Sequence, residues 1–226
     1  MNLLLLLRGM KALHSKKEMM FMILLLQIIE IEKMMLMLML MLHTGPVWAD
    51  DAAPSCDGVT MEIFEVADET AAQMLMDMDF APLAAYEDVI LRNLACLSEP
   101  ITGSAAASVY GMVAMSALVD PQRGETEVRA ALYAAGLAWA GYTLPSIMPS
   151  THKLRVMNTQ AADFSGAYDS MTPHEGSTIV VDGVTARPRR IGAPTIVQIQ
   201  TDGEISSTVY LAPAVAFHSG GGDAQH

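Results

Sequence analysis

The fold is decided by residues 104–142, which read SAAASVYGMVAMSALVDPQRGETEVRAALYAAGLAWAGY. Apolar side chains recur at helical spacing over about 105–119 and again over about 125–142. Proline and glycine at 120–124 predict a turn between the two segments. Because alanine is frequent on both segments, their backbones can approach closely. This stretch therefore predicts a helical hairpin.

The ends of these helices carry recognisable signals. Ser104 is placed to cap the first helix, and Glu125 suits the positive end of the second helix dipole. We expect Trp139 on the apolar face of the second helix. Two further helices are predicted at about 68–77 and 83–97, where Val89 belongs to the apolar stripe of the second. The helical region thus has about four helices.

Beyond residue 177 the pattern changes from helical to alternating. A short strand is expected at 178–181, ending at a turn formed by Asp182 and Gly183. Proline at 188 and 194 keeps the next segment at a sheet edge or in a loop. A short additional element is expected around 154–162. The predicted fold class is α+β, with the helical hairpins followed by a small antiparallel β segment.

The terminal hairpin turns around Asp202 and Gly203. A three-residue loop at 201–203 pairs Ile199 with Ile205 and gathers the apolar side chains on one face. Ile196 is then the single apolar residue on the polar face. A two-residue loop mixes polar and apolar residues on both faces, so we favour the three-residue loop.

Residues 1–49 are predicted to be a signal peptide. Nine apolar residues at 34–42 follow a lysine, and short side chains lead to cleavage between Ala49 and Asp50. Residues 1–32 are interpreted as an extension ahead of this signal. An uncleaved membrane anchor and an internal translation start are the alternatives. We therefore expect an exported protein of the periplasm, outer membrane or medium.

The charge balance narrows the range of partners. The whole chain has a formal net charge of −12, and the part after residue 49 holds 22 acidic and 8 basic side chains. Because phosphate backbones are bound by Lys and Arg, such acidity argues against nucleic acid as a partner. The membrane is expected as a partner only through the signal segment, should it stay uncleaved.

The chain is expected to continue after the signal in three parts. Residues 50–150 form the helical repeat-like domain, 151–217 the small β segment, and 218–226 a disordered tail. Within the first part, residues 50–62 are expected to be extended. The sequence does not indicate an oligomeric state.

The two cysteines, Cys56 and Cys96, both lie after the predicted cleavage site. In an oxidising compartment two cysteines favour one disulfide, here tying the extended segment to a helix. Free thiols and a metal pair are the alternatives. Neither a second cysteine pair nor a nearby histidine supports metal, so the disulfide is preferred.

Two basic clusters stand out in this acidic chain. His152-Lys153-Leu154-Arg155 could bind a carboxylate or phosphate, or could pair with the acidic helices. Arg187, Arg189 and Arg190 could dock an acidic partner, or could serve as solvated loop residues. For the first cluster we favour the structural role.

No catalytic signature accompanies these clusters. The sequence contains neither a nucleophile elbow nor a phosphate-binding glycine loop after a strand. We therefore expect no catalytic residues, no metal and no cofactor.

The helical region resembles a degenerate tetratricopeptide-type repeat, with two helices around the turn at 120–124 and small residues where they cross. Three pieces also occur in a characteristic order: Cys96-Leu97-Ser98-Glu99-Pro100, then His152-Lys153-Leu154-Arg155, then Val181-Asp182-Gly183 followed by Pro194 and Gln198. That order resembles a loose group of exported myxobacteria-type proteins of unknown function, over about residues 90–211. The resemblance implies an envelope protein with an interaction scaffold, and it transfers no active-site residues.

Together these features predict a non-enzymatic envelope protein that binds a protein partner or stabilises an envelope assembly. A small-ligand-binding or cell-wall hydrolytic domain using His152, His174 or nearby acids is the alternative. Capture of a protein partner would support the first hypothesis. Turnover of a substrate by the purified protein would support the second.

Overall fold

The structure, a computed structural model, describes residues 56–161 and 167–213. These described residues belong to one compact unit. The predicted signal peptide at 1–49, its cleavage site between Ala49 and Asp50, and the predicted tail at 218–226 lie outside the described residues. Among the described residues, no helix is both long and apolar enough to cross a membrane.

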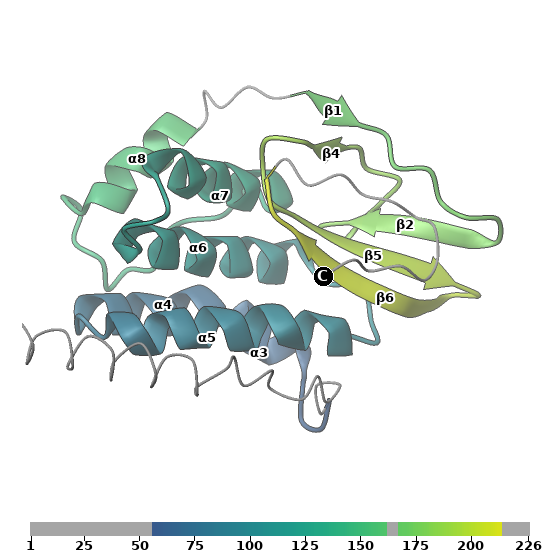
Figure 1. Ribbon diagram of the computed structural model, residues 1–226, viewed down its shortest axis with the longest axis horizontal. Helices are drawn as coiled ribbons and strands as arrows, with labels where there is room; N and C mark the ends of the chain where they lie inside the picture. The colour runs from purple at the N-terminus through teal and green to yellow at the C-terminus, as the bar shows by residue number, and fades with distance from the viewer. Residues whose placement is uncertain (1–55, 162–166, 214–226) are drawn as a thin grey trace, which may run out of the picture. The chain divides into compact units, whose positions relative to one another are not determined.

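The described chain is α+β, as predicted (Figure 1). Its helices are α3 (Met61–Glu65), α4 (Ala67–Met76), α5 (Phe80–Asn93), the 3-10 turn η2 (Leu94–Cys96), α6 (Gly103–Val119), α7 (Glu125–Ala138) and α8 (Lys153–Ala161). Its strands are β1 (Tyr168–Asp169), β2 (Ser177–Val181), β3 (Val184–Thr185), β4 (Arg189–Arg190), β5 (Thr195–Thr201) and β6 (Glu204–Leu211).

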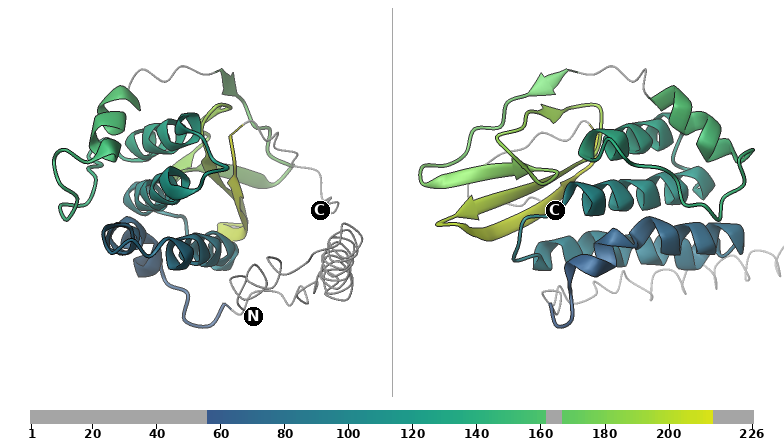
Figure 2. Two further views of the ribbon diagram at one scale, coloured as in Figure 1. Left: turned by 60° about the vertical axis from the view of Figure 1, so that its left-hand side comes forward. Right: turned by 180° about the vertical axis from the view of Figure 1, so that it is seen from behind.

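Helix α6 is the centre of the helical part. Every residue from Ala105 to Ala117 is buried, as expected for a helix that is apolar on all sides. Helices α3, α4, α5 and α7 all pack against it (Figure 2). The tetratricopeptide-like interpretation is not confirmed, because helices surround α6 rather than stacking as successive pairs. The cap is Thr102, whose hydroxyl accepts from the amide of Ala105, and not Ser104 as predicted.

Two further predictions for the helices are wrong. Helix α3 begins at Met61, inside the segment 50–62 that was expected to be extended. Helix α7 ends at Ala138, before the predicted end near 142, because Trp139 is extended and the side chain of Arg187 takes the carbonyl of Leu137. Trp139 is consequently 48% exposed instead of packing on an apolar face.

The main sheet has the strand order β3-β2-β5-β6, and all of its neighbours are antiparallel. Strands β1 and β4 form a separate two-stranded pair. The predicted three-residue loop of the last hairpin is wrong. Thr201 pairs with Glu204 around a two-residue turn, in which both Asp202 and Gly203 have positive φ.

A bulge next to Gln200 explains the error in the hairpin register. Gln200 pairs with Ile205, but Ile199 then pairs with Ser207, so the register changes by one residue inside the hairpin. Ile196 is therefore not misplaced, since it is fully buried in the helical core. The opposite face of the sheet has its own small core of Ile179, Val181, Val197 and Leu211. Both faces of the sheet carry apolar residues. The separation of polar and apolar side chains could therefore not identify the loop length.

The predicted disulfide between Cys56 and Cys96 is confirmed, with 5.2 Å between the two Cα atoms. It fastens the start of the described chain to η2, at the end of α5. A structural disulfide is typical of proteins in oxidising compartments and is compatible with export.

Candidate functional site

The predicted basic cluster at 152–155 makes contacts within the fold. Lys153 pairs with Glu125 at the start of α7. The guanidinium of Arg155 donates to the carbonyl oxygens of Pro145 and Met148, both at 3.0 Å, and Nδ1 of His152 accepts from the amide of Leu154 at 3.3 Å. These contacts hold α8 against α7 and the preceding loop. Anion binding by the cluster stays a prediction.

The three predicted arginines line one cavity of about 220 Å³ between α7 and the sheet. Each guanidinium donates to an acceptor of the protein: Arg187 to the Leu137 carbonyl at 2.8 Å, Arg189 to the Ala212 carbonyl at 3.0 Å, and Arg190 to the Tyr168 hydroxyl at 2.9 Å. Arg190 also stacks on the ring of Tyr168, 4.3 Å from its centroid. The structure thus brings the arginines together, and their binding of an acidic partner stays a prediction.

Asp182 lines the same cavity at the end of β2. Its Oδ1 atom accepts from the hydroxyl of Tyr110 on α6 and from the amide of Ile196 at 3.0 Å. Burial raises the pKa of Asp182 to about 6, although both donors and the charge of Arg187 favour the ionised form. The carboxyl group therefore links the central helix to the sheet.

A more open site lies along α5, which we name the α5 groove. It consists of two adjoining hollows of about 470 and 740 Å³ that share Asp88. The first lies between the start of α5 and the α6–α7 turn, and the second between the end of α5 and strand β6. Its lining residues are Phe80, Ala81, Ala84, Glu87, Asp88, Leu91, Arg92 and Ala95 from α5, Ser116, Val119, Asp120, Pro121 and Arg123 from the turn region, and Thr208, Val209 and Tyr210 from β6.

The wall formed by β6 is an edge of the four-stranded sheet formed by the described residues. The amide and carbonyl of Ile196 both point toward β2, because the amide donates to Asp182 Oδ1 and the carbonyl accepts from the amide of Asp182 at 2.9 Å. In an antiparallel pair, a residue whose backbone points away from its partner forms a non-hydrogen-bonded pair. Tyr210, opposite Ile196, must then direct its backbone groups outward, and so must Thr208, opposite Gln198.

The outward backbone groups of Thr208 and Tyr210 face no further strand within the described chain. Strand β6 is the last strand of the sheet, and its only strand neighbour among residues 56–161 and 167–213 is β5. Natural edge strands are commonly protected by proline, lysine, β-bulges or short length. The bulge of the β5–β6 pair lies near the turn, before Thr208 and Tyr210. Strand β6 has eight residues, with neither proline nor lysine among them. This edge is therefore suited to pairing with an added strand.

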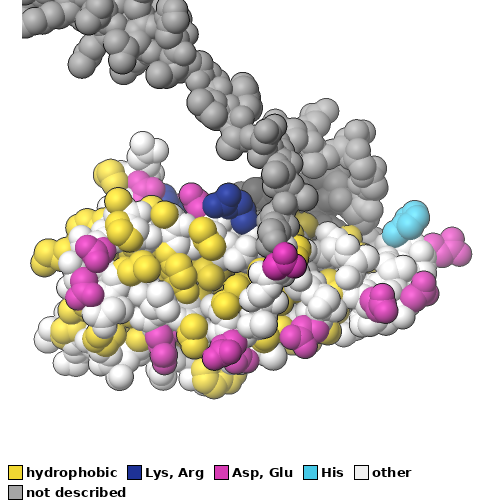
Figure 3. All heavy atoms as spheres, turned by 90° about the horizontal axis from the view of Figure 1, so that it is seen from below, with side chains coloured by type: hydrophobic (Ala, Val, Ile, Leu, Met, Phe, Trp, Pro, Cys, Tyr) yellow, Lys and Arg dark blue, Asp and Glu magenta, His cyan; other side chains and the backbone are white. Residues whose placement is uncertain are grey.

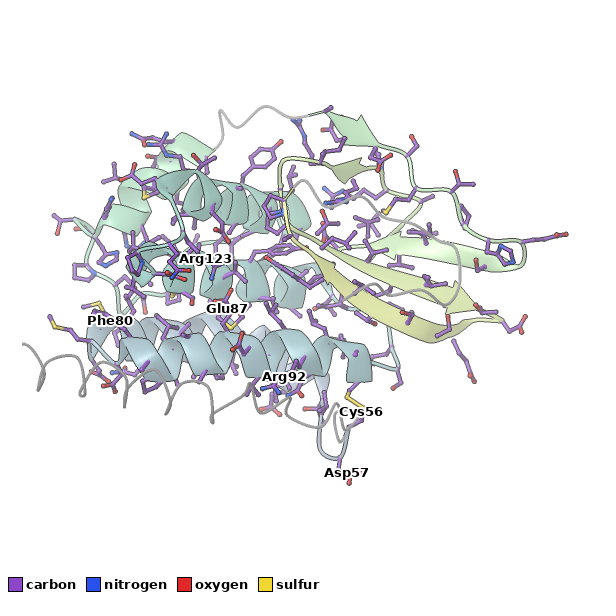
Figure 4. The ribbon with its side chains drawn as sticks, viewed as in Figure 1. Cys56, Asp57, Phe80, Glu87, Arg92 and Arg123 are labelled. Carbon is purple, nitrogen blue, oxygen red and sulfur yellow. A yellow bond between two sulfur atoms is a disulfide. The ribbon has the colours of Figure 1, made fainter. Side chains whose placement is uncertain are left out.

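The floor of the α5 groove is fixed by an ion-pair network. Nη1 of Arg123 donates to both carboxylate oxygens of Glu87, at 2.7 and 3.0 Å, and its Nε atom donates to Glu127 at 2.8 Å. Burial, together with the negative charge of Glu87, raises the pKa of Tyr210 well above its usual value. In Figure 4, Glu87 points from α5 toward Arg123, between Phe80 at one end of the helix and Arg92 toward the other. The network holds α5 in position beside the α6–α7 turn.

The rim of the α5 groove is largely apolar. Phe80 is 46% exposed, and Ala81, Ala84 and Ala95 are exposed as well. The predicted packing of Val89 is wrong, because this side chain is 44% exposed next to the groove. Hydrophobic side chains gather on the helical half of the face seen from below, with acidic side chains around them (Figure 3). The surface thus combines an apolar strip with negative charge.

Sequence reasoning missed this site for two reasons. The stripe on 83–97 was assigned to a single buried face, although exposed alanines at 81, 84, 85 and 95 indicate a second weakly polar face. The edge position of β6 depends on strand order, which the sequence does not specify. The missing proline and lysine in β6 were the one available signal.

Within the described ranges, no group of three or more His, Cys, Asp or Glu side chains is placed to hold a metal ion. Comparisons with protein-family models, curated proteins and solved structures give no match to this chain.

Proposed function

We propose that this chain is an exported, non-enzymatic envelope protein that binds an extended segment of a partner protein in the α5 groove. The segment adds as a further strand to the edge of β6. The observation that carries the proposal is the outward direction of the Thr208 and Tyr210 backbones above an open groove. Strand addition of this kind draws its affinity from main-chain hydrogen bonds.

Side chains around the edge provide for specificity. Alternate residues of an added strand point toward and away from α5, because side chains alternate along a strand. Those that face α5 meet the apolar rim formed by Ala84, Leu91 and Ala95. An extended segment with small or apolar residues at every second position fits this wall.

The charged residues of the groove favour a particular charge on the partner segment. Asp88 and Asp120 line the groove, whereas the positive charge of Arg123 is neutralised by Glu87 and Glu127. Toward Ala95, Arg92 supplies one positive charge. The partner segment is therefore basic near the α6–α7 turn, which also complements the net charge of −12.

The disulfide supports the proposed export. The disulfide between Cys56 and Cys96 lies next to Ala95, at the end of the groove. It is a stable link only outside a reducing cytosol. The predicted signal at 1–49 supports the same compartment.

Two alanines on α5 provide a matched test. Ala95 lines the groove opposite β6, whereas Ala85 is also exposed but lines neither hollow. The full chain, expressed with an affinity tag, is used to capture partners from its native envelope. We expect Ala95→Arg to abolish recovery of the partner retained by the parent chain, and Ala85→Arg to preserve it. Equal recovery with both variants would contradict the proposal.

A further inference from the structure

A second pocket of about 500 Å³ lies apart from the α5 groove and shares no lining residue with it. Its walls come from the α3–α4 junction, the start of α6 and the loop after α7. We name it the Trp139 pocket, after the aromatic side chain in its lining. The residues that matter for its chemistry are Glu65, Asp68, Glu69, Ser108, Trp139 and Tyr142.

All charged residues of this lining are acidic. Glu65 and Glu69 are exposed at the rim, whereas Asp68 is buried. Asp68 is held in place because its Oδ1 atom accepts from the hydroxyl of Ser108 at 2.7 Å, and its amide donates to the same hydroxyl at 3.0 Å. Burial raises the pKa of Asp68, although the Ser108 contact favours the ionised form. A positive ligand would offset the cost of burying this carboxylate.

The side chain of Tyr142 also belongs to the pocket. The hydroxyl of Tyr142 is buried beside the carboxylate of Asp68, and burial together with the negative charge of Asp68 raises the pKa of Tyr142 well above its usual value. The position of this hydroxyl depends on Gly111, because a Cβ atom at residue 111 would lie 2.0 Å from its oxygen. The hydroxyls of Ser108 and Tyr142 thus both hold the Asp68 carboxylate within the lining of the pocket.

The indole of Trp139 completes the pocket. The side chain is 48% exposed, and it packs against Gly141, where a Cβ atom would lie 2.9 Å from the ring. The missing side chain at 141 thus lets the ring lie against the loop backbone. Aromatic faces, and tryptophan above all, attract organic cations.

We infer that the Trp139 pocket binds an organic cation, an amine or quaternary ammonium group, between the Trp139 ring and the carboxylates of Glu65, Asp68 and Glu69. The absence of Lys and Arg from its described lining favours a cation over an anion. A neutral sugar could also stack on an indole, but it has no need of three carboxylates. This inference is independent of the α5 groove.

The test uses the intrinsic fluorescence of Trp139. The chain contains two tryptophans, so Trp48→Phe in the full chain leaves Trp139 as the single reporter. Choline chloride is titrated against this protein at constant ionic strength. Its uncharged isostere 3,3-dimethylbutan-1-ol and N-acetylglucosamine are titrated in parallel. We expect a saturable fluorescence change with choline, and binding of the neutral alcohol weaker by roughly ten-fold or more.

Substitutions at the rim identify the site. Glu69→Gln removes a pocket charge at an exposed position, so we expect it to weaken choline binding about five-fold or more. Glu62→Gln is the matched control, because Glu62 is exposed nearby but does not line the pocket. Absence of saturation with choline, equal binding of choline and the neutral alcohol, binding of the sugar alone, or equal effects of the two substitutions would overturn the inference. Ala95→Arg, in the α5 groove, should leave choline binding unchanged.

Discussion

The hydroxyl of Tyr110, on the central helix, donates a hydrogen bond to the carboxylate of Asp182 at the end of β2. The amide of Ile196 donates to the same hydroxyl oxygen at 2.6 Å, so three segments distant in sequence meet at this point. All three residues are buried. The contact joins α6 to the sheet and so fixes β5 and β6 relative to the helices.

Removal of the Tyr110 hydroxyl should therefore destabilise the fold. Tyr110→Phe deprives the buried carboxyl group of Asp182 of one of its two donors, which is expected to lower the free energy of unfolding by about 1–3 kcal/mol. Urea denaturation at pH 7 measures the change. Tyr168→Phe provides the control, because Tyr168 is 58% exposed. An equal loss of unfolding free energy in both variants would show that the Tyr110–Asp182 hydrogen bond contributes no particular stability.

Asp182 should also make stability depend on pH. Its pKa is raised from 3.8 to about 6 in the folded protein, so between these values the folded chain retains a proton that the unfolded chain has released. The resulting stabilisation is fully present below about pH 4 and is lost as the pH rises through about 6. At about 1.4 kcal/mol per pKa unit, the loss is on the order of 3 kcal/mol.

Asp182→Asn isolates this effect. Asparagine keeps an acceptor for Tyr110 and tolerates the positive φ of 50° found at this position. We expect the stability of Asp182→Asn relative to the parent chain to increase from pH 4 to pH 7, as followed by urea denaturation. A difference that stays constant over this range would mean that Asp182 titrates at its ordinary pKa.

The side chain of Gln198 makes a second link between the two parts of the fold. It accepts from the amide of Ile101 at 2.7 Å and donates to the carbonyl of Glu99 at 3.1 Å. Gln198→Ala leaves both backbone groups without partners, at an expected cost of about 2–4 kcal/mol. Gln200→Ala, two residues along β5, removes only an exposed bond to Gly203 and should cost less than about 0.5 kcal/mol. Thermal unfolding of the two variants measures both losses. Similar losses of stability in the two variants would contradict this prediction.

The disulfide between Cys56 and Cys96 has a separate, measurable contribution. It joins residues 40 positions apart, so the chain-entropy model gives about 4 kcal/mol of stabilisation. The double variant Cys56→Ser with Cys96→Ser should lose most of that stability, and reduction of the parent chain should have the same effect. Urea midpoints that are the same with and without reductant would argue against a stabilising link.

The sequence was most informative about local structure. The helices at 105–119 and 125–138 follow directly from apolar spacing, and the turns at Asp182-Gly183 and Asp202-Gly203 follow from residues that accept positive φ. Features that depend on contacts between distant residues could not be predicted from the sequence in this way. The early end of α7 depends on Arg187, which lies 50 residues beyond Leu137.

The tertiary arrangement of the motifs could be predicted only in part. Glu99 and Gln198, which belong to two of the pieces that carry the family resemblance, are in direct contact through the Gln198 side chain. Gly183 packs so closely on Ile101 that a Cβ atom would lie 2.3 Å from its carbonyl oxygen. The remaining piece, at 152–155, instead fastens α8 to α7. The order of motifs along the chain therefore did not indicate which of them meet.

The candidate site was beyond the reach of sequence patterns. The α5 groove exists because β6 ends the sheet beside α5, and this follows from strand order and from the packing of α6. The basic clusters were predicted as candidate binding sites because positive charges are rare in this acidic chain. In the structure their guanidinium groups bond to backbone carbonyls and to a tyrosine hydroxyl.

Amide hydrogen exchange at β6 tests the central proposal most directly. A peptide is first selected by the full chain from a random library of ten-residue peptides, and exchange at Thr208, Val209 and Tyr210 is followed with and without it. We predict that the amides of Thr208 and Tyr210 exchange much more slowly in the complex, while Val209, already directed toward β5, changes little. Unchanged exchange at Thr208 and Tyr210 in a saturated complex, or failure of any peptide to bind, would contradict strand addition in the α5 groove.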